Sequence, residues 1–366
     1  MVRRYLPKNT EELIHWYERY VSPLALITGF LIDNFLLLDR VDVLWGNVLI
    51  GAYLVIAALS ILFINLVESG RWTHRWVLAS APFIPVVMQF TFGGLFSGFL
   101  ALYSRSAGMI VSWLFVIAIA ALLVGNERFR RLYTRFVFQI SILFTAIFLF
   151  LLYIVPVVLR QIGDWIFVLS GILSVIVMAL FMWLLRKIVP DVIRQNRANV
   201  LTSLMGIFVA FNVLYFTNTI PPLPLSLKEA GVYHGLTRAG NTYTLLAEPS
   251  PWYKKYLTNS SIYHRAPGES VYAFSAVFAP NGLETTIYHE WQRYDEELDK
   301  WINKGTLEFP IRGGRDGGYR GYTLKNDVPA GSWRVNVLTE SGQVVGRVSF
   351  LVEDVPTKVP IVQETY

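Results

Sequence analysis

The sequence contains no cysteine and few charged residues. The absence of cysteine among 366 residues excludes disulfides, thiol catalysis and thiolate metal sites. Only 16% of the residues are charged, whereas a soluble domain carries about a quarter. Hydrophobic residues make up 54% of the chain, and the mean hydropathy is +0.44. This composition predicts a membrane protein. The N-terminus has no apolar signal-peptide core behind its basic residues, so we expect no cleaved signal peptide.

The few charges are unevenly placed. Residues 1–225 hold 17 Lys and Arg against 10 Asp and Glu, whereas residues 226–366 hold 15 against 16. The isoelectric point of about 9.3 therefore arises in the apolar part of the chain. Basic residues there are typical of loops that flank membrane helices and do not indicate a nucleic-acid surface. We expect the lipid bilayer as a partner and no nucleic acid.

Seven long apolar segments lie in the first 220 residues. Each is close to the roughly 20 residues that a helix needs to cross about 30 Å of hydrocarbon. The predicted crossings are 21–38, 43–66, 77–102, 108–125, 136–159, 165–185 and 200–220. Residues 1–20 form a cytoplasmic or interfacial lead-in, in which 9–20 are either a short interfacial helix or a simple connection.

The loops between these segments predict an orientation. The N-terminus and the loops on its side of the membrane carry 14 Lys and Arg, and the opposite loops carry only Arg40, Arg105 and Arg160. Basic loops remain in the cytoplasm, so the N-terminus is predicted to be cytoplasmic. An odd number of crossings then puts the C-terminal domain outside. The expected location is a bacterial inner membrane with a periplasmic C-terminal domain.

Polar side chains inside the predicted crossings are few, and four of them stand out: Asp33, Asn34, Asn65 and Gln89. A carboxylate in hydrocarbon is costly, so Asp33 marks a candidate transport or catalytic site in the bundle. Alternatively, Asp33 reaches the interface or pairs locally, since Arg40 follows seven residues later. No crossing contains a histidine and 200–220 contains no lysine, which excludes bis-histidine haem and a retinal Schiff base there. We expect no cofactor.

A proline-rich stretch, Ile220–His234, divides the chain. Pro221, Pro222 and Pro224 cannot continue a helix and favour a stiff, extended segment. The predicted domains are therefore a lead-in at 1–20, a membrane domain at 21–220, a strut at 221–230 and a soluble domain at 231–366.

The soluble domain has the alternating pattern of β-strands. Strands are predicted at 269–279 and 285–294, joined by a hairpin turn at Asn281-Gly282. Three more predictions follow: a strand at 301–311 that breaks at Lys304-Gly305, a strand at 319–325, and a hairpin that turns at Ser341-Gly342. In that last hairpin Trp333, Val335 and Val337 point inward, as do Val344, Val348, Phe350 and Val352 on the return strand. Residues 226–268 supply one or two further strands. Together they predict an all-β, immunoglobulin-like sandwich.

Several stretches of this domain resemble the bacterial DUF2914 family. The residues that carry the resemblance are Ile220–His234, His289, Trp291, Arg312–Lys325, Gly331–Val335, Gly342, Gly346, Arg347 and Phe350. The preceding helices are similar, more loosely, to a DUF5924-like membrane region. The resemblance implies a multi-helix membrane region followed by a domain of unknown function. It brings no catalytic residues.

One constellation of aromatic and arginine side chains is the candidate binding surface of the soluble domain. Its nine candidate site residues are His289, Trp291, Arg293, Arg312, Arg315, Asp316, Tyr319, Arg320 and Tyr322, and Lys325, Trp333 and Arg334 follow later in the chain. Arginine forks bind carboxylates and phosphates, and aromatic rings stack on sugars. The alternative is structural: the glycine-rich segment 312–321 is a long turn, and the tryptophans and His289 belong to the core. Asp316 and Glu290 could pair as acid and base, but no spacing requires it. The scattered histidines predict no metal site.

These observations favour a non-enzymatic protein. The first hypothesis is a binding, scaffolding or accessory subunit that recognises an envelope glycan, a lipid headgroup or a membrane-protein partner, and that could form an oligomer. The second is a transporter or membrane enzyme with its site near Asp33. A third is a signalling receptor, which would need a separate output partner because the predicted cytoplasmic loops are short.

Overall fold

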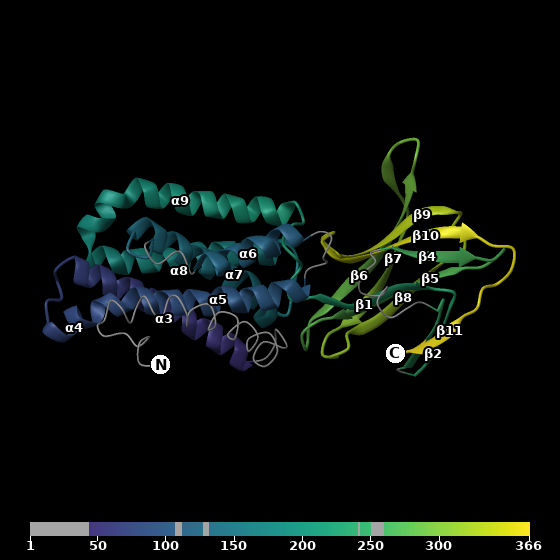
Figure 1. Cartoon of the computed structure of the whole chain (residues 1–366), viewed down its shortest axis with the longest axis horizontal. Coiled ribbons are helices and arrows are strands. Elements are labelled where there is room, and N and C mark those ends of the chain that lie inside the picture. Colours follow the sequence, from purple (N-terminus) through teal and green to yellow (C-terminus); the bar gives the residue numbers. More distant parts are fainter. Residues whose placement is uncertain (1–43, 107–111, 127–131, 241, 250–259) are drawn as a thin grey trace, which may run out of the picture. The chain divides into compact units, whose positions relative to one another are not determined.

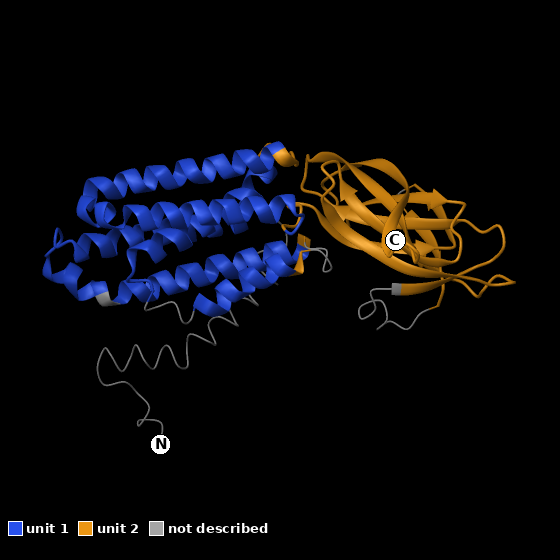
Figure 2. Cartoon of the chain, turned by 90° about the horizontal axis from the view of Figure 1, so that it is seen from above, with its two compact units in different colours: residues 1–105, 114–158, 165–219 blue, residues 106–113, 159–164, 220–366 orange. Residues whose placement is uncertain are grey.

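The computed structural model describes residues 44–106, 112–126, 132–240, 242–249 and 260–366 (Figure 1). The chain divides into a helical unit and a β-rich unit (Figure 2). The β-rich unit consists of residues 220–366 with the short segments 106–113 and 159–164. The expected interfacial helix at 9–20 and the expected crossing at 21–38 lie outside the described residues.

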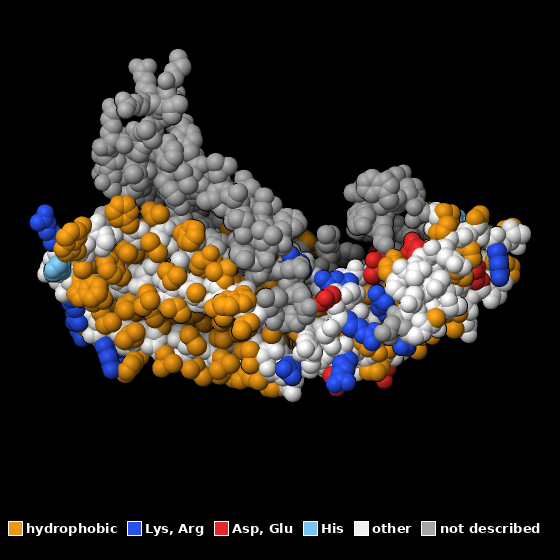
Figure 3. Space-filling view, turned by 90° about the horizontal axis from the view of Figure 1, so that it is seen from below, with side chains coloured by type: hydrophobic (Ala, Val, Ile, Leu, Met, Phe, Trp, Pro, Cys, Tyr) orange, Lys and Arg blue, Asp and Glu red, His pale blue; other side chains and the backbone are white. Residues whose placement is uncertain are grey.

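The described part of the helical unit contains seven α-helices and one 3-10 helix. They are α3 (Leu44–Glu68), α4 (Arg75–Ser80), η4 (Ala81–Phe83), α5 (Ile84–Ser106), α6 (Trp113–Asn126), α7 (Phe136–Leu159), α8 (Asp164–Ile188) and α9 (Pro190–Phe216). Five of them are long and apolar enough to cross a membrane, namely α3, α5, α7, α8 and α9. Hydrophobic side chains spread over the face of this unit that Figure 3 displays, as expected for helices in contact with lipid.

The predicted crossings agree with the observed helices to different degrees. Helix α7 has the predicted bounds of 136–159, and α3 and α8 differ from theirs by a few residues. The predicted crossing 77–102 is not one continuous α-helix. The 3-10 helix η4, which contains Pro82, separates α4 from α5. Helix α6 has 14 residues, fewer than a crossing requires. Seven crossings therefore stay a prediction.

The expected loop at 186–199 is wrong, because most of it is helical. Helix α9 begins at Pro190, ten residues before the predicted crossing. Proline suits the first helical position because its missing N–H has no partner there anyway. Asp191 in the first turn favours the same start through the helix dipole. As a result Arg194 and Arg197 lie on a helix and not in a flexible connection.

The β-rich unit contains eleven strands within the described residues. They are β1 (Ser226–Tyr233), β2 (Gly235–Ala239), β3 (Thr242–Ala247), β4 (Ser260–Arg265), β5 (Val271–Phe278), β6 (Glu284–Asp295), β7 (Lys300–Arg312), β8 (Tyr319–Lys325), β9 (Gly331–Thr339), β10 (Val344–Asp354) and β11 (Val362–Thr365). Three sheets result, with the orders β1-β5-β8, β4-β10-β9-β6-β7 and β11-β3-β2. Residues 226–268 thus hold four strands, where the sequence predicted one or two.

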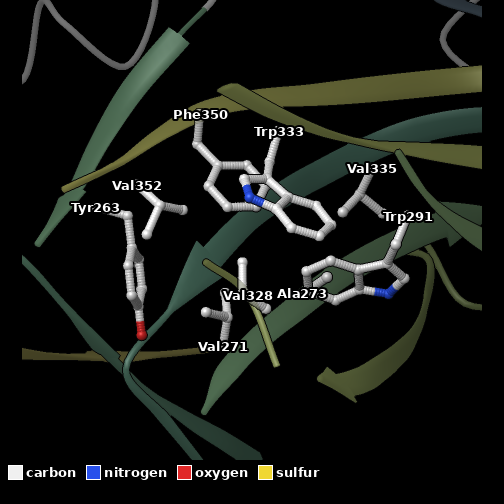
Figure 4. Close-up of a cluster of buried hydrophobic side chains, with 9 residues drawn as sticks. All are labelled: Tyr263, Val271, Ala273, Trp291, Val328, Trp333, Val335, Phe350 and Val352. Carbon is white, nitrogen blue, oxygen red and sulfur yellow. The ribbon is translucent and has the colours of Figure 1, made fainter. Parts of the chain in front are cut away.

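Strand β5 lies between two cores, and this explains its apolar character on both faces. Val271 and Ala273 join Trp291, Trp333 and other side chains of the five-stranded sheet in one buried cluster (Figure 4). On the opposite face Phe274 packs with residues of β1 and β3. Burial of both faces gives a strand without the usual apolar–polar alternation. The C-terminal region is β-rich as expected, and the immunoglobulin-like sandwich stays a prediction.

The predicted hairpin at Asn281-Gly282 is wrong, although the turn is present. Gly282 has φ +79°, and the Leu283 N–H donates to the Pro280 carbonyl at 3.1 Å. The turn joins β5 and β6, which belong to different sheets. Strand β5 already pairs with β1 and β8, so both of its edges are occupied. The Asn-Gly signal determined the turn and not the strand pairing.

Two β-bulges adjust the predicted strand pattern. The expected break at Lys304-Gly305 is a bulge within a continuous β7, since Trp291 pairs with Gly305 and Gln292 with Asn303. A second bulge lies between Val344 and Gly346. It shifts the alternation by one residue, so Val345 is buried where Val344 was expected.

The proline-rich segment turns and does not form an extended strut. The Leu225 N–H donates to the Pro222 carbonyl at 2.9 Å, and the Leu223–Pro224 peptide bond is cis. Leu225 is fully buried in a core cluster of the β-rich unit. Strand β1 starts directly afterwards at Ser226, within the residues assigned to the strut. The segment is therefore part of the β-rich unit.

Candidate functional site

Two of the predicted binding residues, His289 and Trp291, are fully buried. The His289 ring contacts Ser275 Oγ through Nε2 at 2.8 Å and Thr323 Oγ1 through Nδ1 at 2.9 Å. Trp291 Nε1 donates to the same Thr323 oxygen at 3.2 Å. Burial lowers the pKa of His289 to about 3, so the ring is neutral at pH 7. This cluster joins β5, β6 and β8 in the core and removes both residues from any binding surface.

Trp333 occupies the same core, as the alternation of β9 predicted. Its ring is 1% exposed and its Nε1 donates to the Pro329 carbonyl at 2.8 Å. Figure 4 shows Trp333 beside Phe350 and Val335. Arg293 lies at the end of this inner face, where it donates to the Ala330 carbonyl at 3.0 Å. These contacts are structural.

The arginines of the glycine-rich segment are dispersed. Arg312 pairs with Glu284 at 3.0 Å, with both side chains largely exposed. The Arg315 guanidinium lies 5.3 Å from the centre of the Tyr319 ring. Asp316 is exposed in a turn that the Gly318 N–H closes by donating to the Arg315 carbonyl at 3.0 Å. The segment is thus a turn with local contacts, in agreement with the structural alternative.

The last two predicted residues, Arg320 and Tyr322, lie on β8 and share a face of its sheet. The Arg320 carbonyl accepts a hydrogen bond from the Tyr243 hydroxyl at 3.3 Å. Tyr322 is 42% exposed and its ring contacts Tyr243 and Tyr272. This face is opposite to that of Thr323, which points into the core. The nine predicted residues therefore do not form one surface.

The structure brings together a different set, on the outer face of the five-stranded sheet. We call Arg334, Arg347, Asn336, Glu290 and Gln292 the arginine platform. Arg334 Nε donates to Gln292 Oε1 at 2.6 Å, and Arg347 Nε donates to Asn336 Oδ1 at 2.6 Å. Glu290 Oε2 accepts from Asn336 and Gln292, each at 2.8 Å. Three adjacent strands, β6, β9 and β10, contribute these side chains.

The strand register explains why these residues meet. Across the sheet Arg347 pairs with Asn336, and Asn336 pairs with Glu290. One step along, Arg334 pairs with Gln292. Side chains of directly paired residues on one face lie within contact distance. The platform therefore depends on the β9–β10 and β6–β9 pairings.

Trp301 of β7 flanks the platform. The Arg334 guanidinium lies 4.3 Å from the centre of the Trp301 ring, in a cation–π geometry. Trp301 is only partly buried. Aromatic and arginine side chains are enriched at binding surfaces.

The electrostatics of the platform favour an anion. Burial lowers the pKa of Arg334 to about 10, and the neighbouring Arg347 adds to this effect while Glu290 opposes it. Burial also lowers the pKa of Arg347. Both remain charged at pH 7. Glu290 is the only carboxylate among the five platform residues, and within the described residues both arginines donate hydrogen bonds only through Nε.

Of the platform arginines, Arg334 was predicted as part of the aromatic and arginine constellation and Arg347 only as a motif residue, and the platform itself was not predicted. A signal existed in the polar positions two residues apart, Glu290 with Gln292 and Arg334 with Asn336. Such a spacing puts both side chains on the outer face of a strand. The sequence does not indicate which strands are neighbours in the sheet. It was therefore not possible to predict that these two pairs of side chains lie side by side.

A second polar cluster fastens the first strands of the unit. His234 lies between Glu269 at 2.8 Å and Glu248 at 3.0 Å, and Glu248 also contacts His264 at 2.7 Å. The His234 ring stacks on Tyr263. Burial acts to raise the pKa of Glu248, but hydrogen bonds from the two histidines outweigh it and the pKa is lowered. Within the described residues, no three His, Cys, Asp or Glu side chains form a group that could hold a metal ion.

Polar side chains in the helical unit form a neutral network. Asn65 of α3 donates to Gln139 of α7 at 2.7 Å, and Gln139 donates to the Tyr133 carbonyl at 2.6 Å. The Tyr133 hydroxyl bonds to Asn126 of α6, which donates to the Gln89 carbonyl of α5 at 2.7 Å. Asn65 and Gln89 thus help to connect four helices. Asp33 and Asn34 lie outside the described residues.

Comparison with known proteins agrees with part of the resemblance. Residues 284–352 match the family described as "Protein of unknown function (DUF2914)". The matched segment extends from β6 into β10 and contains the complete arginine platform. Residues 284–352 are therefore similar to the DUF2914 family, whose function is unknown. The similarity of the helices to a DUF5924-like region stays a prediction.

The other comparisons do not bear on function. No curated protein matches the chain. One solved structure with a match is "Pseudomonas fluorescens alkylpurine DNA glycosylase AlkC bound to DNA containing an abasic site analog", at 9% identity. The match covers 86% of this chain and 99% of that chain, with a TM-score of 0.21. At this TM-score the similarity supports no conclusion about fold or activity.

Proposed function

We propose that this protein is a non-enzymatic binding subunit of the bacterial envelope whose arginine platform recognises a carboxylate- or phosphate-bearing component. One observation carries the proposal. Two half-buried guanidinium groups, from Arg334 and Arg347, lie on one sheet face with a single carboxylate, Glu290, among the platform residues. Their terminal amino groups can each donate to an incoming oxyanion.

The geometry supports binding better than it supports catalysis. The amides of Asn336 and Gln292 hold the Glu290 carboxylate, and Asn303 Nδ2 donates to its other oxygen at 3.1 Å. Three hydrogen-bond donors thus occupy the oxygens of this carboxylate, which leaves fewer of its lone pairs for a reacting group. The platform holds its two guanidinium groups through their Nε hydrogen bonds, with Trp301 beside Arg334. These properties suit recognition of an acidic sugar or a phosphate group.

The proposal includes a location and a topology. We assign the protein to the inner membrane, with the helices as a seven-crossing anchor, the N-terminus in the cytoplasm and the β-rich unit in the periplasm as an immunoglobulin-like sandwich. The basic loops and the five apolar helices support this assignment. A periplasmic β-rich unit would meet envelope glycans, lipid headgroups and the soluble parts of partner proteins.

Calorimetric titration of the full chain in a non-ionic detergent tests the proposal. The probes are a tetragalacturonate, which carries carboxylates, and an oligo(glycerol phosphate), which carries phosphates. We expect one probe to bind, and Arg334→Gln with Arg347→Gln to weaken it about tenfold or more, because two charge-assisted hydrogen bonds are lost. Which of the two probes binds shows whether the platform recognises a carboxylate or a phosphate.

The matched control is Arg312→Gln with Arg315→Gln, which removes two exposed arginines of the turn. This variant should bind as the unchanged protein does. Loss of binding in the control variant alone would indicate that the binding site lies in the glycine-rich turn. The proposal would be contradicted if neither probe bound the unchanged protein, or if the platform variant bound the probe as tightly as the unchanged protein.

A further inference from the structure

The helical unit contains a groove between α8 and α9 that the proposed function does not use. Its volume is about 810 Å³, and the side chains that line it are almost all apolar, including Ile172, Ile176, Leu201 and Met205. Phe144 of α7 also lines it. The groove therefore offers an apolar channel along a helical hairpin.

Two arginines interrupt this apolar lining. Arg186 comes from the last turn of α8, and Arg197 comes from the N-terminal part of α9. The two helices are joined at Val189, so both arginines lie toward the end of the groove where the hairpin turns. Both side chains are exposed, and within the described residues neither forms an ion pair. This end of the groove offers positive charge without a paired acid.

The length of the groove fits one leaflet of a bilayer. Ile172 precedes Arg186 by 14 residues and Phe208 follows Arg197 by 11 residues, and both line the groove. At 1.5 Å per residue these separations correspond to about 21 and 16 Å along the helices. Half of a hydrocarbon core is about 15 Å thick. An acyl chain could therefore follow the apolar lining while its headgroup stays at the arginine end.

A tryptophan marks the same end as an interface. Trp183 lines the groove, and the Lys187 ammonium lies 3.5 Å from the centre of its ring. Tryptophan and basic residues are enriched where hydrocarbon meets headgroups. Basic pockets between membrane helices bind anionic headgroups, since the guanidinium fork matches a phosphate.

From this combination we infer that the groove between α8 and α9 is a binding site for one anionic phospholipid, with its acyl chains along the apolar lining and its phosphate at Arg186 and Arg197. A zwitterionic lipid offers the same chains but a headgroup ammonium that two arginines repel. The site therefore selects by headgroup charge. It is independent of the arginine platform, which lies in the other unit.

Native mass spectrometry of the full chain tests this inference. The protein is released from a non-ionic detergent in the presence of equal amounts of dioleoylphosphatidylglycerol and dioleoylphosphatidylethanolamine. We expect one phosphatidylglycerol to be retained in preference to phosphatidylethanolamine. In Arg186→Gln with Arg197→Gln, the preference should fall about tenfold or more.

Three further variants separate the contributions of arginine position, positive charge and groove volume to lipid binding. Arg194→Gln is the matched control, because Arg194 is an exposed arginine of the same helix that does not line the groove; its lipid preference should be unchanged. Arg186→Lys with Arg197→Lys retains the charge and should keep most of the preference. Leu201→Trp fills the groove and should reduce retention of both lipids. Circular dichroism of each variant verifies that the helices remain folded.

Several results would overturn the inference. One is retention without a headgroup preference in the unchanged protein. Another is an equal loss of preference in the Arg194 control. A third is retention of no lipid at all.

Discussion

The two units satisfy their buried polar groups in different ways. In the helices the network from Asn65 through Gln139 and Tyr133 to Asn126 consists of amides and a phenol, and none of these groups is charged at pH 7. In the strands the fully buried cluster of His289, Ser275 and Thr323 is neutral too, but the half-buried clusters contain carboxylates with arginines or histidines, as in Glu290 with Asn336 and Arg347. Charges are costly in a lipid environment, whereas a half-exposed sheet face tolerates them.

The different placement of charged groups in the two units indicates where each unit can bind an ionic ligand. In the helical unit the arginines of the α8–α9 groove lie near a helix end, where water and headgroups are accessible, and the apolar lining begins one or two turns away. In the β-rich unit the charges sit in the middle of a sheet face. The four predictions that follow test the comparison in order of decreasing effect.

The largest effect is expected from the tryptophans. Trp291→Ala leaves a cavity in the β-rich core and removes the hydrogen bond to Thr323, so it should lower the free energy of unfolding of that unit by about 3–5 kcal/mol. Trp165→Ala, at an α8 position that is 56% exposed, should change helix stability by less than about 1 kcal/mol. Hydrogen-exchange mass spectrometry of the full chain in detergent measures both. Similar losses would remove the distinction between the two units.

The second prediction concerns pH. The pKa of His289 is about 3 in the folded protein and about 6.5 when unfolded, so below pH 6.5 only the unfolded chain takes up the proton. The stability of the β-rich unit should therefore decrease as pH falls, by up to about 1.4 kcal/mol per pH unit from this group. His289→Gln should have a smaller slope between pH 6.5 and 5.5, measured by exchange of peptides from 284–352. An unchanged slope would mean that His289 is protonated in the fold.

The third prediction tests the neutral network. Asn65→Ala removes the donor to Gln139 across α3 and α7 and should cost the helical unit about 1 kcal/mol. Ser170→Ala is the control, because its hydroxyl donates only to the Ile166 carbonyl of its own helix, at 2.8 Å. Thermal unfolding followed by circular dichroism at 222 nm compares the two. A larger effect of the control would show that local hydroxyl bonds outweigh the network.

The smallest effect is expected at the surface of the β-rich unit. Arg312 and Glu284 form an ion pair 3.0 Å long with both side chains well exposed. Arg312→Ala should therefore change stability by about 0.5 kcal/mol or less, and the change should disappear in 1 M salt. Arg347→Ala, in the half-buried platform, should have the larger effect of the two, since Asn336 loses a partner. Chemical denaturation of the two variants in parallel gives the comparison.

Part of this molecule could be predicted from local patterns. The apolar runs predicted α3, α7 and α8 with bounds close to those observed, and the alternation of Trp333, Val335 and Val337 predicted the buried face of β9. The resemblance to DUF2914 was found from short glycine, tryptophan and arginine motifs, and 284–352 confirms it. The arginine platform could not be predicted in this way. Its members on β6, β9 and β10 are near neighbours only after the strands pair.

The sequence alone thus determined the helices α3, α7 and α8 and the apolar face of β9, because these properties depend on residues close in the chain. The tertiary structure decided the sheet order, the bulges at Lys304 and Val345, and the meeting of Glu290 with Asn336 and Arg347. A one-residue change in strand register would have sent these side chains to the opposite face. Register follows from packing over the whole core, which no local pattern encodes.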